Sequence, residues 1–406
     1  MGFNLHAENY DPPEVRNWRV HLMATIVCMA SLAMGYDTAV IGGTMALDSF
    51  KRDFDLTEGT QSRLDTLQGN IVSTFQAGTV IGVLFTSPIA EKFGRKIAII
   101  FSTVIFLIGG VFMVSSNGSL GLIYAGRAIA GFGVGGVSLI VPVYVAETSP
   151  PSIRGRLVGI FEILAQSGGM FGFWINYIVN RTISSDTKTQ WLIPLGLQLL
   201  PGCLLLCGIF WCPETPRWYA KYDRWEEATG TLSWIRKLPV DNEYVKWELE
   251  EIRIQVETQV SSRNLPPGIK TKIKYYISRL LQPGTRNRIG IGLLLMTFQN
   301  FAGVTVITYY SPRIFETLGV QGTDTKLFAT GFYGVAKTLG VVIFSVWLVE
   351  KVGRRQGLIW GAFVGSLPMW YLAGMYSRPT RRLQVARVTY EADGVTWLWS
   401  VLTSTV

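Results

Sequence analysis

The chain has 406 residues, of which 49% are hydrophobic and only 16% are charged, and its formal net charge is +9. Soluble domains carry about 25% charged residues, so this composition argues against an ordinary soluble domain and for a membrane protein. Lysine and arginine gather in loops between long apolar blocks. This placement indicates orientation in a bilayer and argues against nucleic acid as a partner.

Nine apolar blocks are long enough to cross a membrane as helices, because a span needs about 20 mostly apolar residues. The sequence therefore predicts an all-α, polytopic membrane protein. The polar segment 1–19 contains no cleavable signal, so the first block is itself expected to be a span. With the N-terminus in the cytoplasm, the most basic loops lie inside, as positive residues prefer. The predicted spans are 20–44, 68–90, 97–116, 120–143, 157–179, 191–211, 289–310, 327–349 and 357–376.

Two turns of the same chemistry indicate that the chain is built from two related halves. Glu91–Lys96 follows the second block, Glu350–Arg355 follows the eighth, and both read acid-x-x-Gly-basic-basic. Duplicated six-span halves related by an axis along the membrane normal are typical of transporters. The charged stretch 213–288 is too polar to enter lipid. It predicts a cytoplasmic linker with short helices over Trp225–Leu238 and Glu243–Val256.

Several segments resemble the sugar-porter family of the major facilitator superfamily. They are Gly35–Gly43, Gly126–Gly133, Glu147–Arg156 and Pro213–Trp218. Within that family the chain is most similar to fungal quinate permeases. This narrower likeness rests on Asn17–Arg19, Gly172–Tyr177 and Gln190–Pro194. The resemblance implies a major facilitator fold of two six-helix halves, and transport of a small polyhydroxylated solute by alternating access.

From Ser377 onward the resemblance ends, and the last three spans of the family have no counterpart. We therefore expect a C-terminal half that is truncated after about the ninth span, and a product that does not complete a transport cycle. The predicted division is a cytoplasmic N-terminal segment 1–19, a six-helix bundle 20–212, a cytoplasmic linker 213–288, a partial C-terminal bundle 289–376 and an atypical tail 377–406.

Two charged residues inside predicted spans are candidates for proton coupling. A charge within a span costs about 2.5–3.5 kcal/mol on insertion scales, so each requires a reason. Asp37 and Arg127 lie at matching depths in the first and fourth blocks and are expected to pair. The resemblance implies the same pair, with the aspartate as proton acceptor in proton-coupled members. Protonation of Asp37 would release Arg127 and link charge to conformation; the alternative is a static structural ion pair.

Polar residues in the later blocks are candidates to bind the solute. Gln299, Asn300 and Thr305 align with the family's sugar-binding segment, and such groups suit a polyol because a hydroxyl both donates and accepts. Glu162 stands where most sugar porters carry glutamine, and its carboxylate is expected to be a second titratable site or an acceptor for a solute hydroxyl. Lys337 is expected to bind a substrate carboxylate. The alternatives are helix–helix hydrogen bonding for the seventh-block residues, a snorkelling acid for Glu162, and a backbone carbonyl or Glu162 as the partner of Lys337.

The loop turns supply gating candidates. Glu91 with Arg95, and Glu350 with Arg354, are expected to clamp helix ends at the cytoplasmic surface. Such pairs contribute little singly but bias two states of nearly equal free energy. The family-like loops add four residues to this set, namely Glu147, Arg154, Glu214 and Arg217.

The sequence thus predicts a plasma-membrane transporter, in the first place a proton symporter of a sugar, quinate or a related polyhydroxy acid. Its expected partners are the solute, protons and the lipid bilayer. A transporter-like nutrient sensor and an uncoupled sugar facilitator are the alternatives. Both histidines lie near the N-terminus, and the four cysteines lie in or beside apolar blocks. The sequence therefore contains no Ser/His/acid or Cys/His pattern, and we expect no enzyme activity, no cofactor and no metal site.

Overall fold

The computed structural model describes residues 11–56, 61–260, 278, 280–317 and 322–377. Within these residues the regular elements are all helical, which confirms the all-α prediction. The chain divides into two compact units, the first ending at Val346 and the second beginning at Trp347. Of the predicted tail 377–406, only Ser377 lies among the described residues.

The first six predicted spans correspond to helices with closely similar bounds. α1 begins at Trp18 because the Asn17 side chain accepts hydrogen bonds from the backbone amides of Arg19 at 2.9 Å and Val20 at 3.3 Å. The sixth span is divided into α7 and α8, where Pro201 has no N–H to donate to the preceding turn. The helices are α1 (Trp18–Ala46), α2 (Asp48–Asp53), α3 (Gln61–Phe93), α4 (Arg95–Val114), α5 (Leu120–Thr148), α6 (Arg154–Thr182), α7 (Thr189–Leu197) and α8 (Leu199–Ile209).

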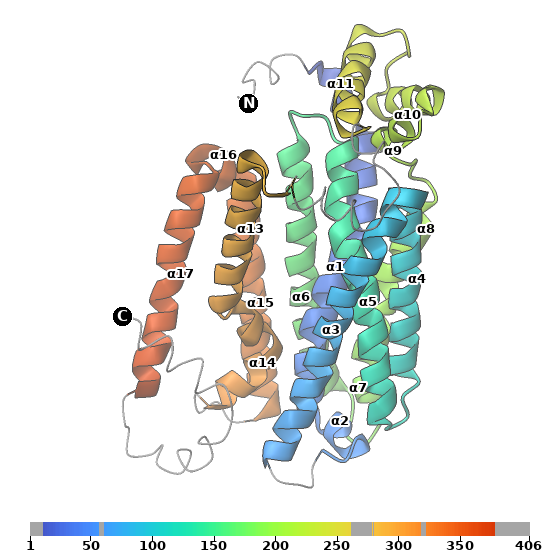
Figure 1. Ribbon diagram of the computed structural model, residues 1–406. Coiled ribbons are helices and arrows are strands. Elements are labelled where there is room, and N and C mark those ends of the chain that lie inside the picture. The colour runs from blue at the N-terminus through green and yellow to red at the C-terminus, as the bar shows by residue number, and fades with distance from the viewer. Residues whose placement is uncertain (1–10, 57–60, 261–277, 279, 318–321, 378–406) are drawn as a thin grey trace. The chain divides into compact units, whose positions relative to one another are not determined.

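Two lengthwise contacts organise this bundle. α1 lies along α6, and α5 lies between α3 and α4 (Figure 1). The α1–α6 contact is fixed by the buried side chain of Asn176, whose Nδ2 donates to the Val40 carbonyl at 2.8 Å. Thr44 Oγ1 donates to Asn176 Oδ1 at 3.1 Å, so both ends of the amide are used. A buried amide that satisfies both groups in this way joins two helices without an uncompensated polar atom.

Short helices of the predicted linker gather beyond one end of the bundle (Figure 1). They are α9 (Pro216–Lys221), α10 (Trp225–Arg236) and α11 (Glu243–Val260), and the last two confirm the predicted linker helices. α10 and α11 enclose a small core in which Val15, from the segment before α1, packs with Leu232 and Val245. The buried Arg236 forms two hydrogen bonds with the Glu248 carboxylate, at 2.8 and 2.6 Å, and thereby joins α10 to α11.

The later part of the first unit contains α13 (Pro283–Phe301), α14 (Val304–Thr317) and α15 (Thr323–Ile343). α15 packs on α6, and α14 packs on α1 and α15. The predicted continuous span 289–310 is wrong, because the chain is interrupted between Phe301 and Val304 and α14 is kinked at Tyr310. Seven helices of the described residues are long and apolar enough to cross a membrane, against nine predicted.

The second unit begins with the end of a short π-helical turn, Phe344–Leu348, which crosses the boundary between the units. It continues with α16 (Val349–Val352) and α17 (Arg354–Ser377). The two helices meet at Gly353, the glycine of the repeated turn, whose φ is +77°. The ninth predicted span, 357–376, is helical throughout, but it is not among the seven helices that are long and apolar enough to cross a membrane.

Candidate functional site

The predicted residues Asp37 and Arg127 are in contact inside the bundle. Arg127 Nη1 donates to Asp37 Oδ2 at 2.8 Å, and neither side chain has exposed surface. The guanidinium lies over the Phe75 ring, 4.2 Å from its centroid, and Nε donates to the Ile71 carbonyl at 3.4 Å. Asp37 Oδ1 and Arg127 Nη2 have no hydrogen-bond partner in the described structure. A single hydrogen bond therefore joins the two charged groups.

Two further side chains lie beside this pair. Tyr309 of α14 is 3% exposed and interacts electrostatically with Asp37 and Arg127. Its phenol oxygen accepts a hydrogen bond from Gln76 Nε2 of α3 at 3.0 Å. Gln76 was not among the residues predicted from the sequence. The available signal was an amide near the middle of the second predicted span, where a polar group needs a partner.

Lys337 of α15 lies where three helices meet. Its Nζ donates to Thr308 Oγ1 of α14 at 3.2 Å, a hydroxyl partner that the sequence did not predict. Glu162 of α6 attracts Lys337 electrostatically and accepts a hydrogen bond from Gln166 Nε2 at 2.5 Å. Thr338 Oγ1 donates to the Gln166 carbonyl at 3.1 Å, which joins α15 to α6. The arrangement places one cation, one carboxylate and several neutral hydrogen-bonding groups along the α6–α15 contact.

The other solute-binding candidates are not brought to this place by any described contact. Gln299 and Asn300 lie on α13, which buries none of its residues, and Asn300 Nδ2 donates to its own helix at the Met296 carbonyl, 2.9 Å away. Thr305 is exposed at the start of α14. Their solute-binding role stays a prediction.

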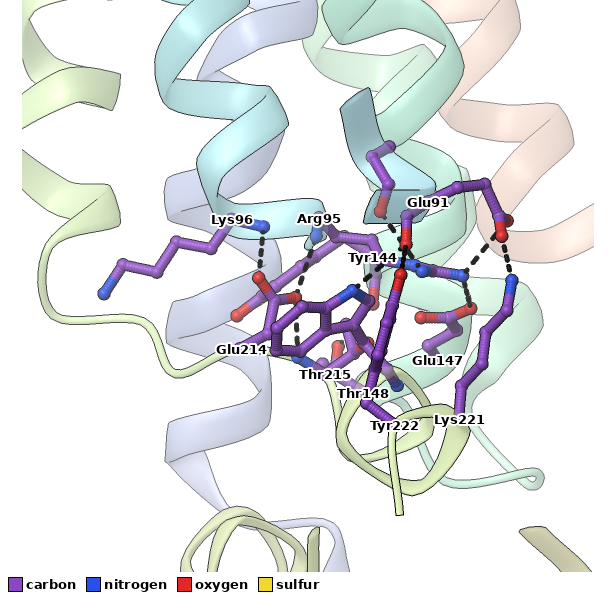
Figure 2. Close-up of polar contacts among 12 residues, drawn as sticks. Glu91, Arg95, Lys96, Tyr144, Glu147, Thr148, Glu214, Thr215, Lys221 and Tyr222 are labelled. Carbon is purple, nitrogen blue, oxygen red and sulfur yellow. Dashed lines mark hydrogen bonds and ion pairs between the residues drawn. The ribbon is translucent and has the colours of Figure 1, made fainter. Parts of the chain in front are cut away.

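Glu214 organises the helix ends at the linker side of the bundle (Figure 2). Its carboxylate accepts hydrogen bonds from the backbone amides of Arg95 at 3.0 Å, Lys96 at 2.9 Å and Thr215 at 2.9 Å. It thereby caps α4, whose N-terminus attracts negative charge. Gly94 is required before α4, because its φ is +108° and a Cβ would lie 2.3 Å from Glu214 Oε2. Burial raises the pKa of the Glu214 carboxyl, and the hydrogen bonds from backbone amides oppose that rise.

Around this cap lies a set of charged residues that we term the helix-end network, comprising Glu91, Arg95, Glu147, Glu214 and Lys221. Arg95 Nη2 lies 3.1 Å from Glu147 Oε1 and 3.9 Å from Glu91 Oε1, and Lys221 forms an ion pair with Glu91. The sequence-predicted pairing of Arg95 with Glu91 is thus present, but Glu147 is the closer partner. Figure 2 shows these side chains converging from α3, α4, α5, α9 and, for Glu214, the segment just before α9.

Residues of α9 and the position after it donate hydrogen bonds to a backbone carbonyl at the C-terminal end of α3. Trp218 Nε1 and the Tyr222 hydroxyl donate to the Glu91 carbonyl at 3.3 and 3.0 Å, and the Tyr144 hydroxyl donates to the Pro213 carbonyl at 2.6 Å. These aromatic donors were not predicted from the sequence. Their signal was the tyrosines and tryptophan at the borders of apolar blocks, a position where such side chains place one polar atom in a wet region.

The remaining gating candidates form fewer described contacts. Arg154 Nη2 donates to the Ser149 carbonyl at 3.4 Å, and Arg154, Arg217 and Glu147 line a small cleft together with residues of α11. The side chains of Glu350 and Arg354, in the second unit, lie outside the described residues. Within the described part of the chain, no group of three His, Cys, Asp or Glu side chains is arranged to hold a metal ion.

The helical bundle, with charged residues buried between its spans and a polar cap at one end, has the architecture of a secondary transporter. The model of the sugar (and other) transporter family matches residues 23–389, which is most of the chain. The chain therefore belongs to the sugar (and other) transporter family and is a multi-pass membrane protein.

Curated relatives are similar over most of the chain. The quinate permease of Neurospora africana is 44% identical over 365 residues, covering 89% of this chain and 67% of the relative. The probable quinate permease of Aspergillus clavatus is 41% identical over 374 residues, covering 90% of this chain and 67% of the relative. The chain spans about two thirds of the length of the relatives it matches.

Solved structures show the same fold. The proton:xylose symporter XylE, a major facilitator superfamily protein bound to 6-bromo-6-deoxy-D-glucose, matches with a TM-score of 0.69 at 27% identity, over 82% of this chain and 70% of that one. A partially occluded inward-open XylE from E. coli matches with a TM-score of 0.67 at 26% identity, over 82% of this chain and 74% of that one. The fold is that of the major facilitator superfamily, as the sequence predicted.

Proposed function

We propose that this protein carries a sugar, quinate or a related polyhydroxy acid across a membrane together with protons, by alternating access. The observation that carries the proposal is the fully buried pair of Asp37 and Arg127. Relatives named quinate permease and a structural neighbour named as a proton:xylose symporter support both the solute class and the coupling. In this proposal the protein lies in the plasma membrane. Residues 1–19 and the linker 213–288 are in the cytoplasm, and the spans are divided between the bundles 20–212 and 289–376.

Asp37 is the proton acceptor in this proposal. A carboxylate in a span is costly, and the Arg127 guanidinium offsets that cost with one hydrogen bond at 2.8 Å. Protonation removes the ionic part of the attraction, so α1 and α5 separate more easily in the protonated state. The proton would thus favour one conformation over the other. The unpartnered Asp37 Oδ1 is the atom at which the proton would be held.

The test is uptake of labelled quinate and glucose by yeast cells that lack their own permeases and express this protein. An inward proton gradient should drive accumulation, and an ionophore should abolish it. Asp37→Asn should abolish gradient-driven accumulation while solute exchange persists, because the neutral amide cannot cycle a proton. Accumulation by Asp37→Asn at the wild-type level would contradict the coupling role. Binding without uptake by the wild type would favour a sensor instead.

Lys337 is the proposed contact for an acidic solute. Its observed hydrogen-bond partner is the neutral Thr308 hydroxyl, so a substrate carboxylate would add an opposite charge at that place. Gln299, Asn300, Thr305 and Glu162 would bind hydroxyl groups of the same solute in this proposal. Lys337→Met should raise the KM for quinate about tenfold or more and leave that for glucose within about twofold, since one charge-assisted hydrogen bond contributes about 1.5–3 kcal/mol. Equal losses for both solutes would make Lys337 a structural residue.

The helix-end network is the proposed cytoplasmic gate. Its members join the ends of α3, α4 and α5 to α9, so they would hold that end of the bundle together while the opposite end is open. Arg154 and Arg217 would belong to this gate. In the second unit, Glu350 and Arg354 would clamp the helix ends of their own repeated turn in the same way.

A further inference from the structure

We propose that the Gln76–Tyr309 hydrogen bond is a latch that holds α14 over the Asp37–Arg127 pair and controls access of water to Asp37. Tyr309 and Gln76 are positioning residues here, because they act through the carboxylate and do not themselves carry the proton. The inference rests on the proposed proton coupling and adds to it a means of controlling when Asp37 is reached.

The backbone of α14 meets α1 close to Asp37. A Cβ on Gly42 would lie 2.2 Å from the Tyr309 carbonyl oxygen, so only glycine allows the two helices to approach this closely. Gly42 lies five residues after Asp37, about one and a half turns along the same helix. Tyr309 is therefore held against the part of α1 that carries the buried carboxylate.

The side chain of Tyr309 adds a second attachment, to α3. Its phenol oxygen accepts from Gln76 Nε2 at 3.0 Å, and the preceding residue, Phe75, supplies the ring beneath the Arg127 guanidinium. The same turn of α3 thus holds both the cation of the pair and the tyrosine beside it. The titratable or charged groups that interact electrostatically with Tyr309 are Asp37 from α1 and Arg127 from α5.

α14 bends at the residue that follows Tyr309. Tyr310 has non-helical dihedral angles, φ −114° and ψ 17°, and Pro312 follows within the helix. A proline cannot donate the backbone hydrogen bond that would straighten the preceding turn. Residues 304–309 can therefore move about this bend once the hydrogen bond to Gln76 is broken. Breaking that bond detaches the phenol from α3 and leaves Thr38 of α1 as its remaining hydrogen-bonding neighbour. The cover over the pair is then loosened, while the Asp37–Arg127 contact itself stays intact.

The test measures how fast Asp37 reacts with a membrane-permeant carbodiimide, which modifies carboxyl groups, in membranes that contain the whole chain. Mass spectrometry of the peptide with Asp37 follows the reaction, and Asp37→Asn identifies the modified site. Gln76→Leu and Tyr309→Phe each remove one partner of the bond while keeping the size of the side chain. Each should accelerate labelling about threefold to tenfold, the range expected for one neutral hydrogen bond. Gln68→Leu, two turns earlier on α3, is the matched control and should label at the wild-type rate.

The double variant separates a latch from a general loss of structure. Because both changes remove the same bond, Gln76→Leu with Tyr309→Phe should label no faster than the faster single variant. Additive acceleration, or wild-type rates in both single variants, would overturn the latch. A failure of proton-driven uptake in the wild type would instead overturn the proposed coupling, and the labelling rates would still report whether the latch exists.

Discussion

The Asp37–Arg127 pair and the helix-end network are both charged clusters of the first unit, yet they differ in exposure and in the number of contacts that each carboxylate makes. The pair has no exposed surface, one direct hydrogen bond and one unpartnered polar atom on each residue. In the network, Arg95 Nε and Glu147 Oε2 also lack a partner, but the Glu91 side chain is 54% exposed and Glu214 accepts from three backbone amides. The buried Asp37 carboxylate is stabilised by one side chain, Arg127, and loses that stabilisation when this contact is removed. An exposed carboxylate such as that of Glu91 can form hydrogen bonds with water when a protein contact is lost.

This difference suits the two proposed tasks. A proton acceptor must change its interactions when one proton binds, which a cluster with a single contact does strongly. A gate must open and close many times without a large change in free energy, which several weak contacts allow. The contrast predicts that substitutions in the pair lower the free energy of unfolding much more than substitutions in the network. Three substitutions test this order.

The largest effect is expected from Arg127→Leu. The substitution leaves the Asp37 carboxylate buried without its counter-charge and should lower the free energy of unfolding by about 3–5 kcal/mol. Thermal unfolding of the purified protein in detergent measures the loss. Adding Asp37→Asn to Arg127→Leu should recover most of the stability, because the stranded charge is then gone. A loss below about 1 kcal/mol in the single variant would show that water reaches the pair freely.

An intermediate effect is expected from Glu214→Ala, which removes the shared acceptor of three backbone amides. The amides at the start of α4 can turn to water in part, so the loss should be about 1–3 kcal/mol. Glu214→Gln keeps an oxygen acceptor and should lose about half as much. The same unfolding assay decides the matter, and equal losses for both variants would mean that charge, not hydrogen bonding, stabilises the cap.

The smallest effect is expected from Glu91→Gln, which removes the exposed carboxylate that pairs with Lys221 and Arg95. Exposed ion pairs contribute at most about 1 kcal/mol, and Arg95 keeps its contact with Glu147. The difference from the wild type should shrink further as salt is raised, because salt screens exposed charges. A salt-independent loss as large as that of Glu214→Ala would place Glu91 among the buried contacts and erase the contrast.

Several features were determined by the sequence alone. Hydrophobic blocks of about 20 residues have one stable form in lipid, because a helix satisfies all its own backbone groups, so the first six spans and the helical class followed directly. The family-like motifs and the charged residues inside spans were also visible, because a charge among apolar residues stands out. The interruption of the seventh predicted span was not visible, since the polar and small residues around Gly303 fit a continuous span as well as a broken one.

The tertiary structure alone decided which polar groups meet. Matching depths for Asp37 and Arg127 could be predicted from their positions in the apolar blocks, but depth leaves open the rotation of each helix. Only packing brought the two side chains to a contact of 2.8 Å. Glu214 lies 119 residues after Arg95, and Tyr309 lies 233 residues after Gln76. Hydrogen bonds of such separation depend on the folding of the whole bundle. Helix propensity and hydropathy are local quantities, so they specify the spans but not the partners that the side chains find between them.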